Sequence, residues 1–227
     1  MSIPSKISEY NNALSSYGAR LIAVSKTKPK EDLLQAYEAG QRDFGENKVQ
    51  ELVDKAESLP KDIAWHMIGH LQRNKVKYIA PFVSLIHSVD SPRLATEINK
   101  QAAKNGRIID CLLQVHIADE ATKFGFDEAE LKEFLSSEAF ANMENIRITG
   151  LMGMATNTQD MEQVRQEFRN LKTLATELAA EAASDKVQIK ELSMGMTSDY
   201  QIACEEGSTM VRIGSAIFGA RNYPNPA

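Results

Sequence analysis

Short apolar segments alternate with longer amphipathic segments along almost the whole chain. The short segments are near-continuous runs of hydrophobic residues, which is typical of strands buried on both faces of a parallel sheet. This pattern predicts strands that are joined by helices rather than by tight hairpins. Eight strands are predicted, at Leu21–Val24, Arg42–Phe44, Ala64–Ile68, Leu85–Val89, Cys111–Ile117, Ile146–Met152, Ile189–Leu192 and Met210–Ile213.

The amphipathic segments predict one helix before the first strand, over roughly Ile7–Tyr17, and seven helices between the strands. In the longest of them, Val164–Leu178, apolar residues recur every three or four positions. Several segments also carry the signals of a helix boundary. Pro29 and Pro92 stand early in a helix, and the segment Ser198–Gln201 has the pattern of a capping box.

Eight strands and their helices within 227 residues predict a single (β/α)8 barrel of the TIM type with an extra N-terminal helix. An open doubly wound sheet is the alternative, because the same alternation of strands and helices produces it. The number of units and the chain length favour the barrel. No internal repeat or Pro-, Gly- or Ser-rich linker divides the chain, so residues 1–227 are interpreted as one domain.

Composition and charge are those of an ordinary globular protein, with 43% hydrophobic and 25% charged residues. The formal net charge of −5 argues against a broad nucleic-acid interface, and no segment has the apolar length of a membrane span. The N-terminus lacks the apolar core of a secretory signal, and Cys111 and Cys204 lie far apart in the sequence. These features predict a cytoplasmic protein with reduced thiols that binds neither nucleic acid nor membranes.

Chemistry is expected at the carboxyl ends of the strands, where the active sites of such barrels lie. The first strand runs into a lysine, Lys26, which alternation places on the same side as Ile22 and Val24. A buried ammonium needs a partner, and a carbonyl cofactor meets this need by forming a Schiff base with the amine. The competing interpretation is that Lys26 simply reaches solvent.

Two further strand ends combine glycine with polar residues. In FGEN at residues 44–47, the glycine permits a tight turn, and Glu46 or Asn47 is expected to begin the next helix. In SMGMT at residues 193–197, the chain turns into a helix N-terminus, where N–H groups and the helix dipole bind anions. The Thr197 hydroxyl is available to an oxyanion if another residue caps this helix, and capping by Thr197 itself is the alternative.

The last strand places an arginine, Arg212, within an apolar run that ends at Gly214. A buried arginine needs an acceptor, which is either a carboxylate such as Asp199 or Glu191 or a bound ligand. Both interpretations stay open. Phosphate sites recur at the last two strands of these barrels. A lysine after the first strand and a phosphate site at the last two suit an aldehyde cofactor that carries a phosphate.

Five motifs occur along nearly the full chain in the order found in a known family. They are AVSK at 23–26, FGEN at 44–47, WHMIGHLQ at 65–72, LSMGM at 192–196 and VRIG at 211–214. With these motifs the chain closely resembles the YggS/PROSC family of pyridoxal phosphate homeostasis proteins. The resemblance implies a barrel like the alanine racemase N-terminal domain, without the accompanying β-domain. It also implies a monomer that holds pyridoxal 5'-phosphate as an internal aldimine on Lys26.

The resemblance further implies roles for individual residues. It assigns the phosphate to Thr197 and to the backbone around Gly214 and Ser215, and it places Asn47 beside the cofactor. Arg212 corresponds to the arginine that faces the pyridine nitrogen, which weakens the ring as an electron sink. The predicted cofactor-binding residues are Lys26, Asn47, Ser193, Thr197, Arg212, Gly214 and Ser215.

The expected function is to bind pyridoxal phosphate, limit the free aldehyde and deliver it to apoenzymes that depend on it. Amino-acid and keto-acid balance would be affected indirectly. The alternative is a pyridoxal-phosphate-dependent amino-acid racemase that uses Lys26 as one base. Racemisation needs a second base on the opposite face of the ring. Because the racemases take that base from a β-domain of a partner subunit, and the chain ends soon after its eighth strand, a carrier is expected rather than an enzyme.

No metal site is expected, because the four histidines show no spacing typical of metal ligands. His66 and His116 are close enough to strand ends to approach a cofactor. Hydrogen bonds that satisfy them inside the barrel are the preferred interpretation.

Overall fold

The computed structural model describes residues 1–118, 124–182 and 184–219. Eight parallel strands pair in sequence order, and the last pairs with the first to close a barrel. The predicted (β/α)8 barrel is therefore confirmed, and the open sheet is excluded. The strands are β1 (Arg20–Val24), β2 (Asp43–Glu46), β3 (Ala64–Met67), β4 (Leu85–Val89), β5 (Ile109–Gln114), β6 (Ile146–Met152), β7 (Val187–Ser193) and β8 (Met210–Ile213).

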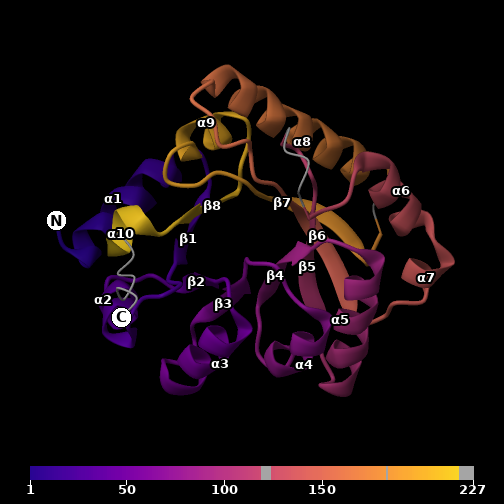
Figure 1. The fold of residues 1–227 in the computed structure, drawn as a ribbon, viewed down its shortest axis with the longest axis horizontal. Coiled ribbons are helices and arrows are strands. Elements are labelled where there is room, and N and C mark those ends of the chain that lie inside the picture. The colour runs from indigo at the N-terminus through magenta and orange to yellow at the C-terminus, as the bar shows by residue number, and fades with distance from the viewer. Residues whose placement is uncertain (119–123, 183, 220–227) are drawn as a thin grey trace, which may run out of the picture.

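Helices cover the outside of the strand ring (Figure 1). Two helices, rather than the single one predicted, lie between β5 and β6, because Ser137 ends the first and its hydroxyl caps the second. The helices are α1 (Ile3–Ser15), α2 (Lys30–Glu38), α3 (Val49–Ser58), α4 (Val76–Ile79, after the 3-10 turn Arg73–Lys75), α5 (Pro92–Lys104), α6 (Glu128–Ser136), α7 (Glu138–Ala141), α8 (Met161–Glu181), α9 (Tyr200–Glu205) and α10 (Ser215–Phe218).

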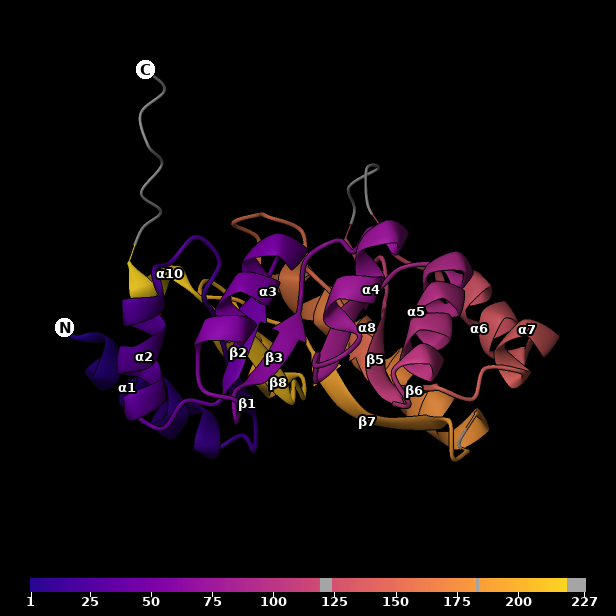
Figure 2. The ribbon, with the colours of Figure 1, turned by 90° about the horizontal axis from the view of Figure 1, so that it is seen from below.

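The N-terminal helix α1 packs against β1, α2 and α10, and Figure 2 shows it beside α2. It buries Ile7, Tyr10 and Leu14, which lie on one helical face. Because α10 is a single turn after β8, α1 supplies most of the cover over this part of the barrel wall. The helix begins earlier than predicted, since the Ser2 hydroxyl accepts a hydrogen bond from the Ser5 N–H at the helix start.

The barrel interior is less apolar than its outer surface. Outward-facing residues join the helices in one large buried cluster, whereas a small separate cluster lies inside the ring. In the register, Arg212 lies beside Ile22 of this inner cluster, and His66 lies beside Leu85. Polar side chains therefore share the interior with apolar ones. The inner cluster consists of Ile22, Leu85, Leu112, Met152 and Met210.

The largest difference from the predicted strands concerns β5, which ends at Gln114 rather than at residue 117. Beyond Gln114, the Val115 N–H still donates to the Met152 carbonyl of β6, but Val115 forms an isolated bridge with Phe126 and the His116 N–H donates to the Phe126 carbonyl. Both cysteines are buried free thiols, as predicted. Across the described residues, no helix combines the length and the apolar character needed to cross a membrane.

Candidate functional site

A cavity of about 500 Å³ opens at the carboxyl ends of the strands, between the segments that follow β1, β2, β7 and β8. It brings together six of the seven predicted cofactor-binding residues, and Ser193 is the exception. Among the described residues that line it, three are basic and none is acidic, which favours an anionic ligand. The lining residues are Val24, Lys26, Lys28, Asn47, Ile68, Met154, Met196, Thr197, Ser198, Arg212, Gly214, Ser215 and Gly219.

Lys26 is half-buried, and the backbone on both sides of it is firmly held. Before it, the Ser25 carbonyl accepts a hydrogen bond from the Lys55 ammonium at 2.7 Å. After it, Thr27 adopts a left-handed conformation with φ 63°, and its N–H donates to a Glu51 carboxylate oxygen at 2.6 Å. A non-glycine residue is strained at such a φ and adopts it only where its surroundings hold it there. These contacts therefore fix the direction in which Lys26 leaves the strand.

A buried ion pair supports the Lys26 segment from behind. The Lys55 ammonium lies 2.8 Å from a carboxylate oxygen of Glu46, and that oxygen also accepts a hydrogen bond from the Ser25 hydroxyl at 2.6 Å. Burial raises the pKa of the Glu46 carboxyl, although Lys55 and Ser25 oppose the change. The sequence prediction for Glu46 was wrong: it is the last residue of β2, and α3 begins only at Val49 without a side-chain cap.

Asn47 reaches the cavity because the loop after β3 packs tightly on its backbone. A Cβ at Gly69 would come within 2.6 Å of the Asn47 carbonyl oxygen. Gly45 is required for a similar reason and not for the predicted tight turn, because a Cβ there would come within 2.9 Å of the Ile68 side chain inside the barrel. Glycine thus permits close packing at both positions.

The loop after β7 is shaped by a glycine in the left-handed region. Gly195 has φ 93°, and a Cβ there would come within 2.6 Å of the Ala203 Cβ. Its carbonyl accepts the Arg212 N–H at 3.0 Å, which ties the loop to β8. This geometry holds the following residues of the loop at the rim of the cavity.

The helix start after this loop differs from the prediction. Helix α9 begins at Tyr200, with Asp199 at the cap position and no side-chain cap, so the predicted capping box of Ser198 is absent. The Asp199 carboxylate instead accepts the Met196 N–H within the loop. Burial raises the pKa of Asp199, although this hydrogen bond opposes the change. Thr197 and Ser198 both line the cavity and are exposed.

Arg212 is 5% exposed and is held by neutral acceptors. It donates to the Ser193 carbonyl at 2.7 Å, to the Ser193 hydroxyl at 2.6 Å and to the Gly153 carbonyl at 3.1 Å. Burial lowers the pKa of Arg212 to about 10, so it stays protonated at neutral pH. Ser193 lies behind Arg212 and is not among the residues that line the cavity.

The carboxylates that the sequence offered as partners of Arg212 have other partners. Glu191 forms an ion pair with Arg20 at 2.7 Å, and Asp199 holds the β7 loop through Met196. The charge of Asp199 still acts on Arg212 from a distance, since it opposes the lowering of the Arg212 pKa. The direct ion pair of Arg212 with Asp199 or Glu191, which the sequence left open, is therefore not formed.

Gly214 permits a close approach between the ends of β8 and β1. A Cβ at this position would come within 3.0 Å of the Val24 carbonyl oxygen at the end of β1. Helix α10 begins at the next residue, Ser215, and the Gly214 carbonyl accepts the N–H groups of Ile217 and Phe218 in its single turn. The β1 and β8 ends are thus brought together at one wall of the cavity.

A family model for the alanine racemase N-terminal domain matches residues 2–222. The chain is 43% identical over 206 residues to a pyridoxal phosphate homeostasis protein of Aquifex aeolicus, covering 90% of this chain and 88% of the relative. The chain belongs to the pyridoxal phosphate homeostasis protein family. A member from Escherichia coli is 42% identical over 207 residues, covering 89% of this chain and 86% of the relative.

Solved structures agree with this family. The structure of PipY from Synechococcus elongatus with pyridoxal phosphate bound has a TM-score of 0.86 and 36% identity, and it covers 96% of this chain and 100% of that one. Alanine racemase from Bartonella henselae has a TM-score of 0.73 at 14% identity, over 99% of this chain and 62% of that one. The second likeness shows the fold alone.

Proposed function

We propose that this chain binds pyridoxal 5'-phosphate covalently through Lys26 and acts in vitamin B6 homeostasis. One observation carries the proposal: Lys26 lines the same cavity as Arg212, Thr197 and the backbone at Gly214. A lysine amine and a basic pocket for an anion are the two requirements of an aldehyde that carries a phosphate. Family members are named for pyridoxal phosphate homeostasis, and the similar PipY structure has pyridoxal phosphate bound.

The residues around the β7 and β8 ends fit the phosphate. The hydroxyls of Thr197 and Ser215 line the cavity, and Gly214 lets the backbone approach a ligand without a Cβ. Hydroxyls and backbone N–H groups are the donors that bind phosphate oxygens in such barrels. The basic and non-acidic lining adds a favourable electrostatic field.

The remaining lining residues fit an aromatic ring. Ile68, Met154 and Met196 supply apolar walls, and Asn47 supplies a polar amide on the β2 side. Arg212 is the candidate partner of the pyridine nitrogen, because its guanidinium is a donor that stays charged. When bound, the cofactor supplies an aldehyde carbon that forms a reducible carbon–nitrogen double bond with the lysine amine.

The same geometry supports a carrier better than a racemase. A donor that stays protonated opposite the pyridine nitrogen disfavours protonation of that nitrogen, which carbanion chemistry requires. Among the described residues that line the cavity, Lys26 and Lys28 are the candidate bases, and these residues include no tyrosine, histidine or carboxylate. We therefore propose that the loaded protein racemises alanine no faster than free pyridoxal phosphate does.

The proposal extends to how the protein works in the cell. We propose a monomer as the binding unit, as the resemblance to the family implies. The two buried free thiols suit a reducing compartment, and we propose the cytoplasm. Apoenzymes that depend on pyridoxal phosphate are the proposed recipients.

Borohydride reduction of the pyridoxal-phosphate-loaded protein tests the assignment. We expect one reduced label, mapped by peptide mass spectrometry to Lys26, and no label after Lys26→Ala. Lys30→Ala is the matched control, because Lys30 lies in the same segment but pairs with Asp54 at 2.8 Å outside the cavity. A label on another lysine, or full labelling of the Lys26→Ala protein, would overturn the proposal.

A further inference from the structure

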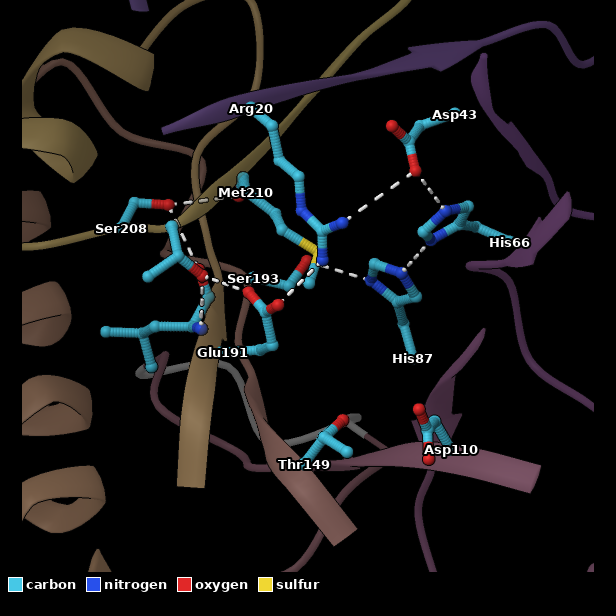
Figure 3. A network of polar contacts seen from close by, with 12 residues as sticks. Arg20, Asp43, His66, His87, Asp110, Thr149, Glu191, Ser193, Ser208 and Met210 are labelled. Carbon is cyan, nitrogen blue, oxygen red and sulfur yellow. Dashed lines mark hydrogen bonds and ion pairs between the residues drawn. The ribbon is translucent and has the colours of Figure 1, made fainter. Parts of the chain in front are cut away.

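A line of polar side chains crosses the barrel interior (Figure 3). It starts at Asp43 on β2 and continues through His66 on β3 and His87 on β4 to Ser193 on β7. Each link measures 2.9 Å: Asp43 Oδ1 to His66 Nε2, His66 Nδ1 to His87 Nε2, and His87 Nδ1 to Ser193 Oγ. We call these four residues the polar line. At its far end, Ser193 accepts a hydrogen bond from Arg212.

The polar line joins the two ends of the barrel. Asp43 and His66 line a second cavity, of about 360 Å³, at the amino-terminal ends of the strands. Arg212 lines the cavity at the carboxyl ends. The link from His87 to Ser193 spans the interior from β4 to β7, two strands that do not pair with each other.

The hydrogen-bond partners of Ser193 set the direction of its link to His87. Arginine has donors and no acceptor, so Arg212 donates to the Ser193 hydroxyl oxygen. Within the described part of the chain, the remaining hydrogen-bond partner of this hydroxyl is His87 Nδ1. Ser193 therefore donates to His87, and the His87 ring accepts at Nδ1.

The direction of the link between Ser193 and His87 determines the direction of the other two. A ring that accepts at Nδ1 carries its proton at Nε2, so His87 donates to His66 Nδ1. By the same logic, His66 carries its proton at Nε2 and donates to the Asp43 carboxylate. Burial, with the charge of Arg212 acting in the same direction, holds the pKa of His87 well below its ordinary value, which agrees with a neutral ring.

A fully satisfied polar line is an unusual use of a barrel interior. Branched apolar residues normally fill this space, and apolar replacements of buried polar networks are often neutral or stabilising. The ring nitrogens of both histidines and the Ser193 hydroxyl all have partners. Stability alone therefore does not explain the line, whereas its contact with the cavity arginine does.

We propose that His66 and His87 are positioning residues, which act through Ser193 to fix the orientation of Arg212 in the cofactor cavity. This inference rests on the proposed function only for its effect on the cofactor. Reversal of the line would turn the Ser193 hydroxyl hydrogen away from His87 and leave it without a partner in a buried site, which is unfavourable. The hydrogen bond that Arg212 donates to Ser193 thus favours one direction of donation along the polar line.

His87→Leu breaks the line, and we expect it to weaken pyridoxal phosphate binding about tenfold and to shift the visible absorption band of the bound cofactor. His87→Gln is the rescue variant, because its amide accepts at oxygen and donates at nitrogen like the neutral ring. We expect it to restore most of the affinity and the band. Equal affinities and spectra for wild type and His87→Leu would overturn the proposal.

Serine variants provide a matched control within the same barrel. Ser193 and Ser208 are both buried, but Ser208 bonds to the carbonyls of Leu192, Met194 and Met210 and lies outside the line. We expect Ser193→Ala to shift the cofactor band and Ser208→Ala to leave it unchanged. If both variants shift the band equally, a general packing effect explains it and the proposal fails.

Nitrogen NMR of the histidine rings tests the direction without any cofactor. We expect His66 and His87 of the cofactor-free protein to be neutral and protonated at Nε2 at neutral pH. A His87 ring protonated at Nδ1 would overturn the inference. If the wild type binds no pyridoxal phosphate, the proposed function fails while these ring spectra still decide the line. If His87→Leu does not fold, Ser193→Ala and the spectra decide it.

Discussion

The two ends of the barrel handle charge in opposite ways. The amino-terminal cavity is lined by three basic and three acidic residues, and the carboxyl-end cavity by three basic and no acidic ones. At the amino-terminal end, Arg147 makes two hydrogen bonds to Asp110, at 2.7 and 2.9 Å. At the carboxyl end, Arg212 is held by carbonyls and a hydroxyl. The amino-terminal end pairs its arginine with a carboxylate, and the carboxyl end holds its arginine with neutral acceptors.

This difference separates a structural arginine from a binding arginine. An arginine with a carboxylate partner is already compensated, so it has little to gain from an anion. A buried arginine with neutral acceptors is positioned but not compensated, which lowers its pKa and favours an electron-rich ligand. The acceptor type, more than the depth of burial, therefore distinguishes the two roles.

Arginine replacements should produce the largest effect. Arg212→Met removes a charged donor from the cofactor cavity, and we expect pyridoxal phosphate affinity to fall by about 1.5–3 kcal/mol, roughly 10- to 100-fold. Arg147→Met removes a partly exposed ion pair, and we expect affinity within about twofold of wild type and a stability loss below about 1 kcal/mol. Absorption titration and thermal unfolding of the cofactor-free proteins measure both quantities. A similar loss of affinity in the two variants would refute the contrast between the ends.

Glycine replacements at the two ends should have the next largest effect. Gly195, in the loop after β7, and Gly207, in the loop before β8, both have φ 93°. Alanine is strained at either position, by about 1 kcal/mol or more. At Gly195 the new Cβ also meets the Ala203 Cβ at 2.6 Å, whereas at Gly207 it meets the flexible Lys172 side chain at 3.3 Å.

Gly195→Ala is therefore expected to lower the unfolding free energy at least twice as much as Gly207→Ala, and to weaken cofactor binding as well. For a chain of this size, each kcal/mol corresponds to about 2–4 °C in Tm. Calorimetry of both cofactor-free variants gives the comparison. Equal losses would mean that the loop after β7 yields to the extra methyl group and does not hold the cavity rim.

The barrel was predictable because its signal is repeated along the chain. The run Ile146–Met152 agrees with β6, since turn and polar residues bound it on both sides. Prediction failed at residues 115–117, where Val115 still donates its N–H to the Met152 carbonyl of β6 but the chain also pairs with Phe126. A long-range partner of this kind leaves no local pattern in the sequence.

The site was only partly predictable for a related reason. Motifs at strand ends identified Lys26 and Arg212, because strand ends of a barrel converge on one face. The support from Lys55 was missed, since a lysine in an amphipathic helix is normally solvated, and its bond to Ser25 joins residues 30 positions apart. Ser193 was assigned to the cofactor, but alternation predicts only that it faces inward and not which partner it meets.

The smallest expected effect concerns the response of the two ends to acid. Burial favours the neutral form of both Asp43 and Asp199. At the amino-terminal end, the hydrogen bond from His66 and the charge of Arg20 outweigh burial and lower the pKa of Asp43. At the carboxyl end, burial prevails and raises the pKa of Asp199. Asp43 should therefore stabilise the fold at neutral pH and lose this contribution as the pH falls, whereas the contribution of Asp199 is present in acid and lost as the pH rises.

Asparagine replacements convert this contrast into opposite shifts of Tm, because they keep the acceptor oxygen and remove the charge. We expect Asp43→Asn to lower the Tm at pH 7 and Asp199→Asn to raise it, by a few degrees or less. Both differences should shrink as the pH falls, and that of Asp43 should persist to lower pH because its pKa is lowered. Unfolding curves measured from neutral to acid pH check the signs. Shifts of the same sign at pH 7 would mean that the carboxyls of Asp43 and Asp199 are stabilised in the same way. That result would contradict the contrast between the two ends of the barrel.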